Sequence, residues 1–377
     1  MIKPQALLMV ADSEHDADMY YAVRMFVPDP FIWLRCGGRD IIVLSDLEFD
    51  RARKQAPHCQ VLPLSRYQRR LRRQGCERPG QAEVVMALLR ERKIRRITVP
   101  RAFPFGLAAE LQRGGVKVEA CAGAFFPERE FKTAREVKML EQALGMAEIG
   151  MAEAMRVLRA AKIAKDRRLL YRSAPLTSER LRSRVDGAIL QAGGIALHTI
   201  VAGGKQGCDP HEGGHGPLRA HETIILDIFP RAQATGYFGD ITRTVVRGRA
   251  SEAVRRLYDT VHRGQSLAFQ QMRAGVATAQ VHRQVQEFFQ QQGYPTGRKQ
   301  GRMQGFFHGT GHGLGLEIHE APRVGPTSPG KLQAGQVVTV EPGLYYPHIG
   351  GVRLEDVALV TKSKPRNLTR FEKVLEL

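Results

Sequence analysis

The sequence predicts two domains, an α/β domain over residues 1–125 followed by an α+β domain over residues 126–377. A chain of 377 residues is long for one compact unit, and each part is large enough to bury its own hydrophobic core. In the first part, short apolar runs alternate with helical segments. In the second, a long amphipathic helix precedes a series of β-branched runs.

Three segments support the α/β prediction for the first domain. DIIVLSD, residues 40–46, has the length and branched side chains of a buried strand, and AEVVMALLRER, residues 82–92, has the pattern of a helix. RRITVP, residues 95–100, reads as another strand that a proline ends. Strands separated by helices favour a largely parallel sheet.

A long helix opens the second domain. Its apolar residues recur at alternating spacings of three and four, which places them on one stripe that faces a core. These residues are Val137, Leu140, Leu144, Ala147, Met151, Ala154 and Leu158. Packing accounts for them fully, and we assign them no chemical role.

The net charge of +19 is the unusual feature of an otherwise ordinary globular composition. Two arginine-rich stretches, residues 66–73 and 90–96, contribute to it. Positive surfaces attract phosphates without specificity, so nucleic-acid binding has to be considered. No nucleic-acid motif accompanies the charge. We therefore expect a solvated surface, with nucleic-acid binding that is at most nonspecific.

Cysteines and apolar runs indicate the compartment. Five cysteines are an odd number without a CxxC pair, so free thiols in a reducing compartment are expected. The apolar run at residues 6–11 is too short for a membrane span and meets acids at once, without a cleavage pattern. We expect a cytoplasmic protein that does not enter a membrane.

Four acids lie inside apolar, β-branched runs of the second domain: Asp227, Asp240, Glu341 and Glu355. A buried carboxylate costs several kcal/mol unless a cation neutralises it. Four such groups in one core would repel one another, and two divalent ions would satisfy them. Oxygen ligands with an imidazole suit manganese, cobalt, iron or zinc; manganese is the first expectation.

A histidine-rich segment, residues 306–322, supplies candidate imidazoles at His308, His312 and His319, among glycines that let the backbone approach a ligand. Alone it is only a histidine-rich loop. Strand periodicity places Thr242 on the same face as Asp240, where its hydroxyl could hydrogen-bond the metal carboxylates.

Four segments of the second domain resemble those of a known enzyme family. HGTGHGLGLEIHE, VEPGLYY, GGVRLED and GDITRT resemble the signature segments of the pita-bread metallopeptidases, the group of methionine aminopeptidase, aminopeptidase P, prolidase and creatinase. The resemblance spans roughly residues 130–377. Residues 128–151 resemble the helix that opens the catalytic domain of the aminopeptidase P and prolidase branch, and residues 1–125 are similar to the N-terminal domain of that branch in size and position. The implied fold is a creatinase/prolidase-like α/β domain followed by a pita-bread catalytic domain.

The resemblance implies a complete ligand set for two metal ions. It makes Asp227 a ligand of one ion, Asp240 and Glu355 the bridges, and His312 with Glu341 the ligands of the other. One departure stands out: Asp227 and Asp240 are thirteen residues apart, two more than in the family pattern. Two extra residues preserve strand parity if they lie in the turn, residues 230–236. We expect them to alter the rim of the pocket more than metal binding.

The resemblance also implies catalytic roles. Glu341 becomes the proton acceptor, and His319 the donor to the intermediate or to the leaving nitrogen. His211 resembles the histidine that closes the other side of the proline pocket. His215, four residues later, competes for that role but fits the spacing to Asp227 less well.

Substrate contacts are implied at three further residues. His308 matches an active-site histidine of aminopeptidase P, although a structural role is an equal alternative. Arg323 resembles a prolidase arginine near the substrate carboxylate, and Arg353 is a substrate-binding candidate that could instead orient the site. A guanidinium suits a terminal carboxylate.

The implied activity is hydrolysis of the bond before proline, by a homodimer with two metal ions per chain. Whether it is a dipeptidase or an aminopeptidase stays open. The alternative function is a catalytically weak scaffold that binds nucleic acid or protein through its basic surface.

Overall fold

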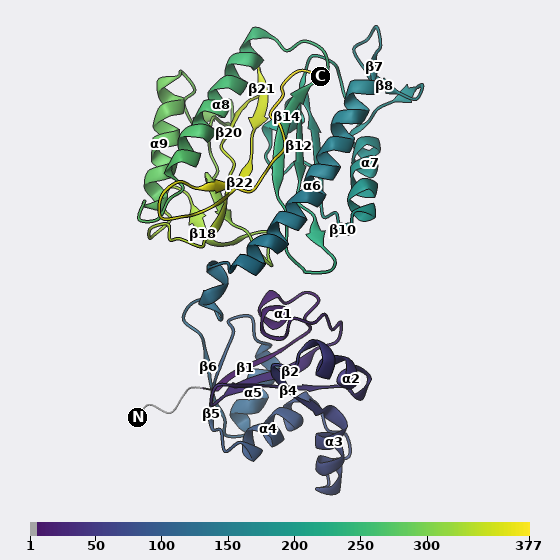
Figure 1. The fold of residues 1–377 in the computed structure, drawn as a ribbon, viewed down its shortest axis with the longest axis vertical. Coiled ribbons are helices and arrows are strands. Elements are labelled where there is room, and N and C mark those ends of the chain that lie inside the picture. Colours follow the sequence, from purple (N-terminus) through teal and green to yellow (C-terminus); the bar gives the residue numbers. More distant parts are fainter. Residues whose placement is uncertain (1–5) are drawn as a thin grey trace. The chain divides into compact units, whose positions relative to one another are not determined.

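The computed structural model describes residues 6–377 and divides the chain into two compact units, Met1–Arg129 and Glu130–Leu377 (Figure 1). Each unit is described by itself. Among the described residues, no helix is long and apolar enough to cross a membrane.

The first unit contains one six-stranded sheet in the order β4-β3-β2-β1-β5-β6. The strands are β1 (Ala6–Ala11), β2 (Phe31–Cys36), β3 (Arg39–Leu44), β4 (Cys59–Pro63), β5 (Arg96–Val99) and β6 (Lys117–Ala120). The contacts β3–β4, β1–β5 and β5–β6 are parallel, whereas β1–β2 and β2–β3 are antiparallel. The prediction of a largely parallel sheet is therefore wrong for β2.

A two-glycine turn explains the antiparallel part. Gly37 and Gly38 join β2 to β3 with φ of 57° and 74°, and two consecutive residues at positive φ make the tight hairpin turn that favours glycine. Such a turn returns the chain beside the strand it has just left. β4, β5 and β6, by contrast, each pair in parallel with a neighbouring strand.

Five helices cover the two faces of this sheet. They are α1 (Ala17–Val23), α2 (Asp46–Gln55), α3 (Leu64–Arg73), α4 (Gln81–Glu91) and α5 (Phe105–Arg113). Successive strand residues point to opposite faces: Leu8 and Val10 pack in the core under α3, α4 and α5, whereas Met9 packs in the core beside α1 and α2. Phe125 and Phe126 close the second of these cores against Trp33.

The second unit has helices outside and strands between them (Figure 1). The long helix α6 (Ala134–Ala160) begins at a capping box between Thr133 and Glu136, and all seven residues of its predicted stripe are buried. With α7 (Ser178–Gln191) it packs on β12 and β14. Helices α8 (Glu252–Gln271) and α9 (Thr278–Gln291) form a second core with β19 to β22.

The strands of the second unit form two main sheets and several short ribbons. One sheet is β11 (Ile200–Gly203), β12 (Thr223–Ile228) and β14 (Ile241–Val246). The other is β18 (Glu320–Val324), β17 (Gly311–Gly313), β19 (Val337–Val340), β22 (Asp356–Leu359) and β23 (Arg366–Asn367). β20 (Gly343–Tyr346) pairs with β21 (Gly350–Arg353).

The remaining elements are short. They are η1 (Pro127–Glu130), β7 (Lys162–Ile163), β8 (Leu169–Tyr171), β9 (Ala174–Pro175), β10 (Gly194–Ile195), η2 (Gly204–Cys208), β13 (Arg231–Ala232), β15 (Gly297–Lys299) and β16 (Arg302–Gln304).

Candidate metal centre

Two of the five predicted metal ligands lie within strands, and the other three lie directly beside strand ends. Asp227 lies in β12 and His312 in the middle of β17. Asp240 precedes β14 directly, Glu341 follows β19 directly, and Glu355 lies between β21 and β22. Three of the four acids therefore lie at strand ends, where the sequence placed them inside strands. Strand ends leave the chain free to turn each carboxylate toward one cavity.

The long turn between the two aspartates does not disturb their register. Asp227 is paired with Thr242, and Ile228 with Ile241. The intervening chain extends away as β13, which pairs with β10. The extra residues thus lie in this extension, and Asp227 and Asp240 remain beside one another at the end of the β12–β14 ladder.

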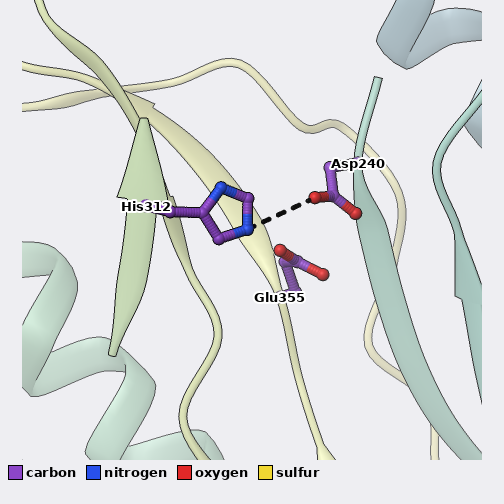
Figure 2. A group of neighbouring side chains, drawn as sticks. All are labelled: Asp240, His312 and Glu355. Carbon is purple, nitrogen blue, oxygen red and sulfur yellow. Dashed lines mark ion pairs between the residues drawn. The ribbon is translucent and has the colours of Figure 1, made fainter. Parts of the chain in front are cut away.

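Asp240, His312 and Glu355 converge on one point (Figure 2). Each offers one ligand atom, and these atoms all lie within 4.8 Å of one another. His312 Nε2 is 3.7 Å from Asp240 Oδ2 and 3.3 Å from Glu341 Oε1. Three predicted acid ligands, Asp240, Glu341 and Glu355, therefore lie close to the His312 ring.

Thr242 and Arg353 connect Asp227 to this group. The Thr242 hydroxyl lies 2.8 Å from Asp227 Oδ1 and 2.7 Å from Glu355 Oε2, and Arg353 donates to Asp227 Oδ2 at 2.6 Å. All five predicted ligands line one cavity of about 650 Å³.

The electrostatics show that the cluster carries too much negative charge for its surroundings. Burial, reinforced by the neighbouring carboxylates, raises the pKa of Asp240 and of Glu355 well above the usual values. Burial also raises the pKa of Glu341 to about 7 and lowers that of His312 to about 4. These acids favour protonation unless a cation neutralises them. Carboxylates with one neutral imidazole are a donor set that fits divalent ions.

Glycines beside His312 let neighbouring strands approach the ligand. A Cβ at Gly311 would lie 1.9 Å from the Thr339 carbonyl oxygen, and one at Gly313 would lie 2.1 Å from that of Ala321. The Gly313 carbonyl oxygen lies 3.1 Å from His312 Nδ1. This contact occupies Nδ1 and leaves Nε2 for the centre of the cavity.

His319 and His211 line the same cavity, whereas His215 does not. The His319 ring stands at 86° to that of His312, with centroids 4.4 Å apart. Burial, and then the proximity of His312, lowers the pKa of His319 to about 4, so its imidazole is neutral near pH 7. His215 lines a different cavity. The structure thus separates the two candidates for the second histidine position.

His308 has both ring nitrogens engaged. Nδ1 lies 2.8 Å from the Gly309 carbonyl oxygen, and Nε2 lies 2.9 Å from the Tyr345 hydroxyl. That hydroxyl accepts a hydrogen bond from Arg353 at 3.1 Å, so it can donate its own proton to Nε2. Burial lowers the pKa of His308 to about 3. A neutral imidazole, protonated at Nδ1, satisfies every partner.

The two candidate arginines differ in their surroundings. Arg353 is buried and donates to Asp227, Thr242, Tyr345 and the Pro210 carbonyl oxygen. Arg323 is exposed on the cavity wall. The geometry of Arg353 is that of a group that orients the site.

Comparison with known proteins identifies the family. A profile of metallopeptidase family M24 matches residues 138–362. The chain belongs to this family. Membership of M24 implies the use of divalent metal, in agreement with the carboxylate and histidine cluster.

Relatives and solved structures agree with the M24 assignment. The chain is 28% identical to an Xaa-Pro dipeptidase of Pyrococcus horikoshii over 285 residues, 75% of each chain. Its fold is similar to that of prolidase from Pyrococcus furiosus, with a TM-score of 0.79, 21% identity and coverage of 98% of this chain and 97% of the other. It is also similar to an X-Pro aminopeptidase from Thermotoga maritima, with a TM-score of 0.83, 21% identity and coverage of 99% and 97%. The predicted fold, an α/β domain before a pita-bread domain, is confirmed.

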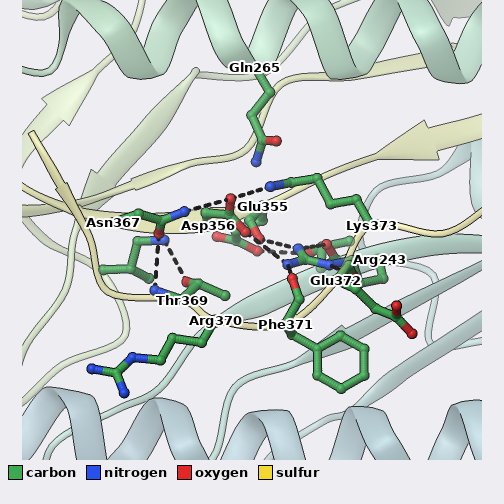
Figure 3. A network of polar contacts seen from close by, with 12 residues as sticks. Arg243, Gln265, Glu355, Asp356, Asn367, Thr369, Arg370, Phe371, Glu372 and Lys373 are labelled. Atoms are coloured by element: carbon green, nitrogen blue, oxygen red, sulfur yellow. Dashed lines mark hydrogen bonds and ion pairs between the residues drawn. The ribbon is translucent and has the colours of Figure 1, made fainter.

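The M24 site has a buried support that the sequence analysis missed (Figure 3). Arg243 is fully buried and donates to the Thr242 and Glu355 carbonyl oxygens at 2.9 and 2.6 Å, and to Asp356 Oδ1 at 2.9 Å. It also donates to the carbonyl oxygens of Phe371 and Glu372. Arg243 therefore fixes the backbone of Glu355, which lines the cavity, and of Thr242, whose hydroxyl contacts Asp227 and Glu355.

A sequence signal for Arg243 existed. The residue interrupts the apolar strand ITRTVV in the same way that the acids interrupt theirs, and a buried charge requires partners. Its main partner, Asp356, stands next to Glu355 in the sequence. A metal-ligand pattern consists of acids and histidines, so it does not single out Arg243 and Asp356.

A second missed group supports His319. Glu320 accepts hydrogen bonds from the backbone N–H groups of Leu316 and Glu317, and it pairs with the buried ammonium of Lys132 at 2.9 Å. These bonds fix the turn that carries His319. The lysine comes from the segment before α6, far away in the sequence, so no local pattern indicates the contact.

Proposed function

We propose that this chain is a dinuclear-metal exopeptidase that hydrolyses the peptide bond before proline. The observation that carries the proposal is the group of four carboxylates and one imidazole in a single cavity, in which the imidazole and three of the carboxylates are buried. The named activity of the Pyrococcus horikoshii relative supports the proline preference. Xaa-Pro dipeptidase and aminopeptidase P activity are the two forms that this function can take.

Asp227, Asp240, His312, Glu341 and Glu355 are proposed to hold two divalent ions, with manganese first and cobalt, zinc or iron as alternatives. When bound, the ions would polarise a water molecule and the scissile carbonyl. Thr242 serves both ends of the ligand set, because its hydroxyl contacts Asp227 and Glu355 at once. That contact supports its proposed role in orienting the carboxylates.

Proton transfer is proposed for Glu341 and His319. Glu341 Oε1 lies 3.3 Å from His312 Nε2 at the proposed metal position, and the second oxygen of such a carboxylate can take up a proton from the attacking water. His319 is neutral near pH 7 and retains one N–H. That N–H can donate to the oxyanion or to the leaving nitrogen, while His211 lines the other part of the cavity.

Substrate binding is proposed for His308, Arg323 and His211. Arg323 is the exposed guanidinium on the cavity wall, which suits the terminal carboxylate of a short peptide. His308 forms a fixed part of the wall, because both of its ring nitrogens are occupied. For Arg353 the geometry supports orientation of Asp227 over contact with substrate.

A peptide panel tests this function. The manganese-loaded protein should cleave Xaa-Pro and Xaa-Pro-Yaa peptides and leave matched Xaa-Ala and Xaa-Ala-Yaa peptides largely intact. Cleavage of Xaa-Pro alone would identify a dipeptidase, and cleavage of the longer series an aminopeptidase. Equal cleavage of the alanine series, or no cleavage with any of the four metals, would contradict the proposal.

Assembly and location extend the proposal. We propose a homodimer in the cytoplasm. All five cysteines are free thiols, which suits a reducing compartment. Light scattering on the purified protein should give twice the mass of 42.1 kDa.

A further inference from the structure

Two adjoining cavities lie in the second unit, apart from the metal ligands. One has a volume of about 450 Å³ and the other about 440 Å³, and they share His348 and Ile349 in their walls. Four basic side chains line them, namely Lys205, Arg219, Arg298 and Lys299. Glu222 is the one acid among the lining residues, and Arg219 lies 3.6 Å from it. The walls therefore carry a surplus of positive charge.

Histidines in the same walls point to an anion and not to a metal. His215, His221 and His348 line the larger cavity. Within residues 6–377, the histidines and acids close enough to share an ion are Asp240, His312 and Glu355, none of which lies here. Separated imidazoles and ammonium or guanidinium groups offer N–H donors, which are the groups that bind phosphate oxygens.

Two backbone features strengthen the anion preference. Helix α8 begins at this cavity, with Ser251 as its cap and Val254 in the wall, and the positive end of a helix dipole attracts anions. Thr223 in the wall is 1% exposed, and its hydroxyl has no hydrogen-bond partner among the described residues. Gly350 keeps the space beside that hydroxyl, since a Cβ there would lie 2.6 Å from Thr223 Oγ1. An unsatisfied buried hydroxyl indicates an unfilled ligand or water position.

We propose that the two adjoining cavities bind a ligand with a chain of phosphate groups, either a free oligophosphate or the phosphates of a nucleotide. Basic side chains are divided between the two cavities, so a ligand that occupies both is expected to carry negative charge in each. Lys205 and Arg219 line one cavity, whereas Arg298 and Lys299 line the other. A linear chain of phosphates carries negative charge along its length and matches this division.

The site is connected to the metal cavity by one loop, residues 204–216. Gln206 holds both ends of the loop together, since its amide donates to the His215 carbonyl oxygen at 2.9 Å and accepts from the His215 N–H at 3.0 Å. Between these ends, Asp209, Pro210 and His211 line the metal cavity. A ligand held by Lys205 and His215 would brace this loop and change peptide hydrolysis, a consequence that rests on the proposed function.

Isothermal titration of the full-length, metal-loaded protein tests binding directly, with inorganic tripolyphosphate in one series and ATP in the other. Metal content is measured before and after each titration, because both probes also chelate metals. The test variant is Lys205→Gln with Lys299→Gln. Both side chains are exposed, and neither lies among the proposed metal ligands. Lys138→Gln, an exposed lysine on α6, is the matched control.

The expected result is one saturable site whose Kd rises at least about tenfold in the double variant, as two charge-assisted contacts are lost, and is unchanged in Lys138→Gln. Equal affinity for both probes would identify free oligophosphate chemistry, and tighter binding of ATP would identify a nucleotide. Binding should persist in Asp240→Ala, which separates this site from the metal centre. Absence of saturable binding, or equal binding by the double variant and wild type, would overturn the proposal.

The connection to catalysis has its own readout. Saturating ligand should change kcat/KM for an Xaa-Pro peptide by about twofold or more in wild type, and the double variant should not respond at the same ligand concentration. Binding without this change would overturn the bracing of the loop. Because the titration does not depend on hydrolysis, a failure of the peptidase proposal would leave the binding result readable.

Discussion

The second unit contains two neighbouring charged clusters, the proposed ligand cluster and the cluster around Asp356. They differ in how far their charges are balanced. The Thr242 hydroxyl contacts Glu355 within the proposed ligand cluster. The residues that follow them in the sequence, Arg243 and Asp356, contact each other on the opposite side of the same two segments. Consecutive residues of an extended chain point to opposite sides. The same two segments therefore supply both clusters.

The balance of charge separates a structural cluster from a functional one. Asp356 lies between Arg243 and Lys373, with Asn367 donating to its second oxygen, so this group is satisfied without help (Figure 3). The ligand cluster has four carboxylates around one buried guanidinium, that of Arg353. A surplus of buried negative charge that the protein does not neutralise is where a cation binds.

The largest effect should come from removing Asp240, which is proposed to bridge the two ions. Asp240→Ala should abolish metal uptake and lower kcat/KM by more than about 100-fold, which is the upper loss caused by removing a residue that only hydrogen-bonds a ligand. Metal analysis and peptide hydrolysis on one preparation measure both. A variant that still binds two ions with unchanged affinity would show that the ligand assignment is wrong.

His319→Ala should remove chemistry and leave the metals. We expect kcat to fall by roughly 10²–10⁴, the usual range for a lost proton-transfer group, while metal content and melting temperature stay close to wild type. His15→Ala provides the matched control, since that histidine is exposed in the first unit and lines neither the metal cavity nor the two basic cavities. If His319→Ala loses activity only together with its metals, the residue is structural.

Breaking the balanced cluster should affect stability first. Arg243→Met leaves Asp356 with Lys373 and Asn367 and removes the donors to the Thr242 and Glu355 backbone. Loss of one partner from a buried pair costs about 3–5 kcal/mol of unfolding free energy. Urea unfolding of the metal-free protein measures it. A loss below about 1 kcal/mol would mean that the buried guanidinium does not hold this junction.

The pH dependence of stability should differ between the metal-free protein and the metal-loaded protein. Glu341, Asp240 and Glu355 have pKa values raised above their unfolded values, with Glu341 at about 7. From about pH 7 upward ordinary histidines are largely neutral, so the lowered pKa values of His308, His312 and His319 no longer oppose the acids. In that range the folded metal-free protein binds more protons than the unfolded chain, and its stability falls as pH rises through about 7. Saturating manganese should remove this fall. A melting temperature of the metal-free protein that rises from about pH 7 to about pH 8 would contradict the sign.

The smallest effect concerns the arginines of α3. Arg69, Arg72 and Arg73 are exposed, and their replacement by glutamine should leave kcat/KM within about twofold of wild type. Any nucleic-acid binding should be weak and removed by moderate salt, as expected of nonspecific phosphate contacts. Sequence-selective binding at physiological salt would instead favour the binding-module alternative.

The sequence predicted which acids would lie together in one cavity, because buried charge is visible as a polar residue in an apolar run. Asp227 and Asp240 stand out in this way, and the structure brings them to one cavity. Arg243 also interrupts an apolar run, but an arginine does not bind a cation and therefore does not belong to a metal-ligand pattern. Three of the acids lie at strand ends, a detail that apolar runs do not resolve because they continue past the last ladder bond.

Other features depend on contacts between distant segments. The pairing of Lys132 with Glu320 joins residues that are 188 apart, and the walls of the two basic cavities come from four separate stretches of chain. No local spacing predicts such a juxtaposition. The antiparallel position of β2 was, by contrast, predictable from the two glycines at residues 37 and 38.

Metal stoichiometry tests the central claim most directly, namely that uncompensated buried carboxylates hold divalent ions. Metal-free protein is dialysed against manganese, and bound metal is measured together with melting temperature. We predict close to two ions per chain and a higher melting temperature in the loaded protein, because ligands that bind only the folded state stabilise it. The account would be contradicted if dialysis against manganese, cobalt, zinc or iron left no metal bound and did not change the melting temperature.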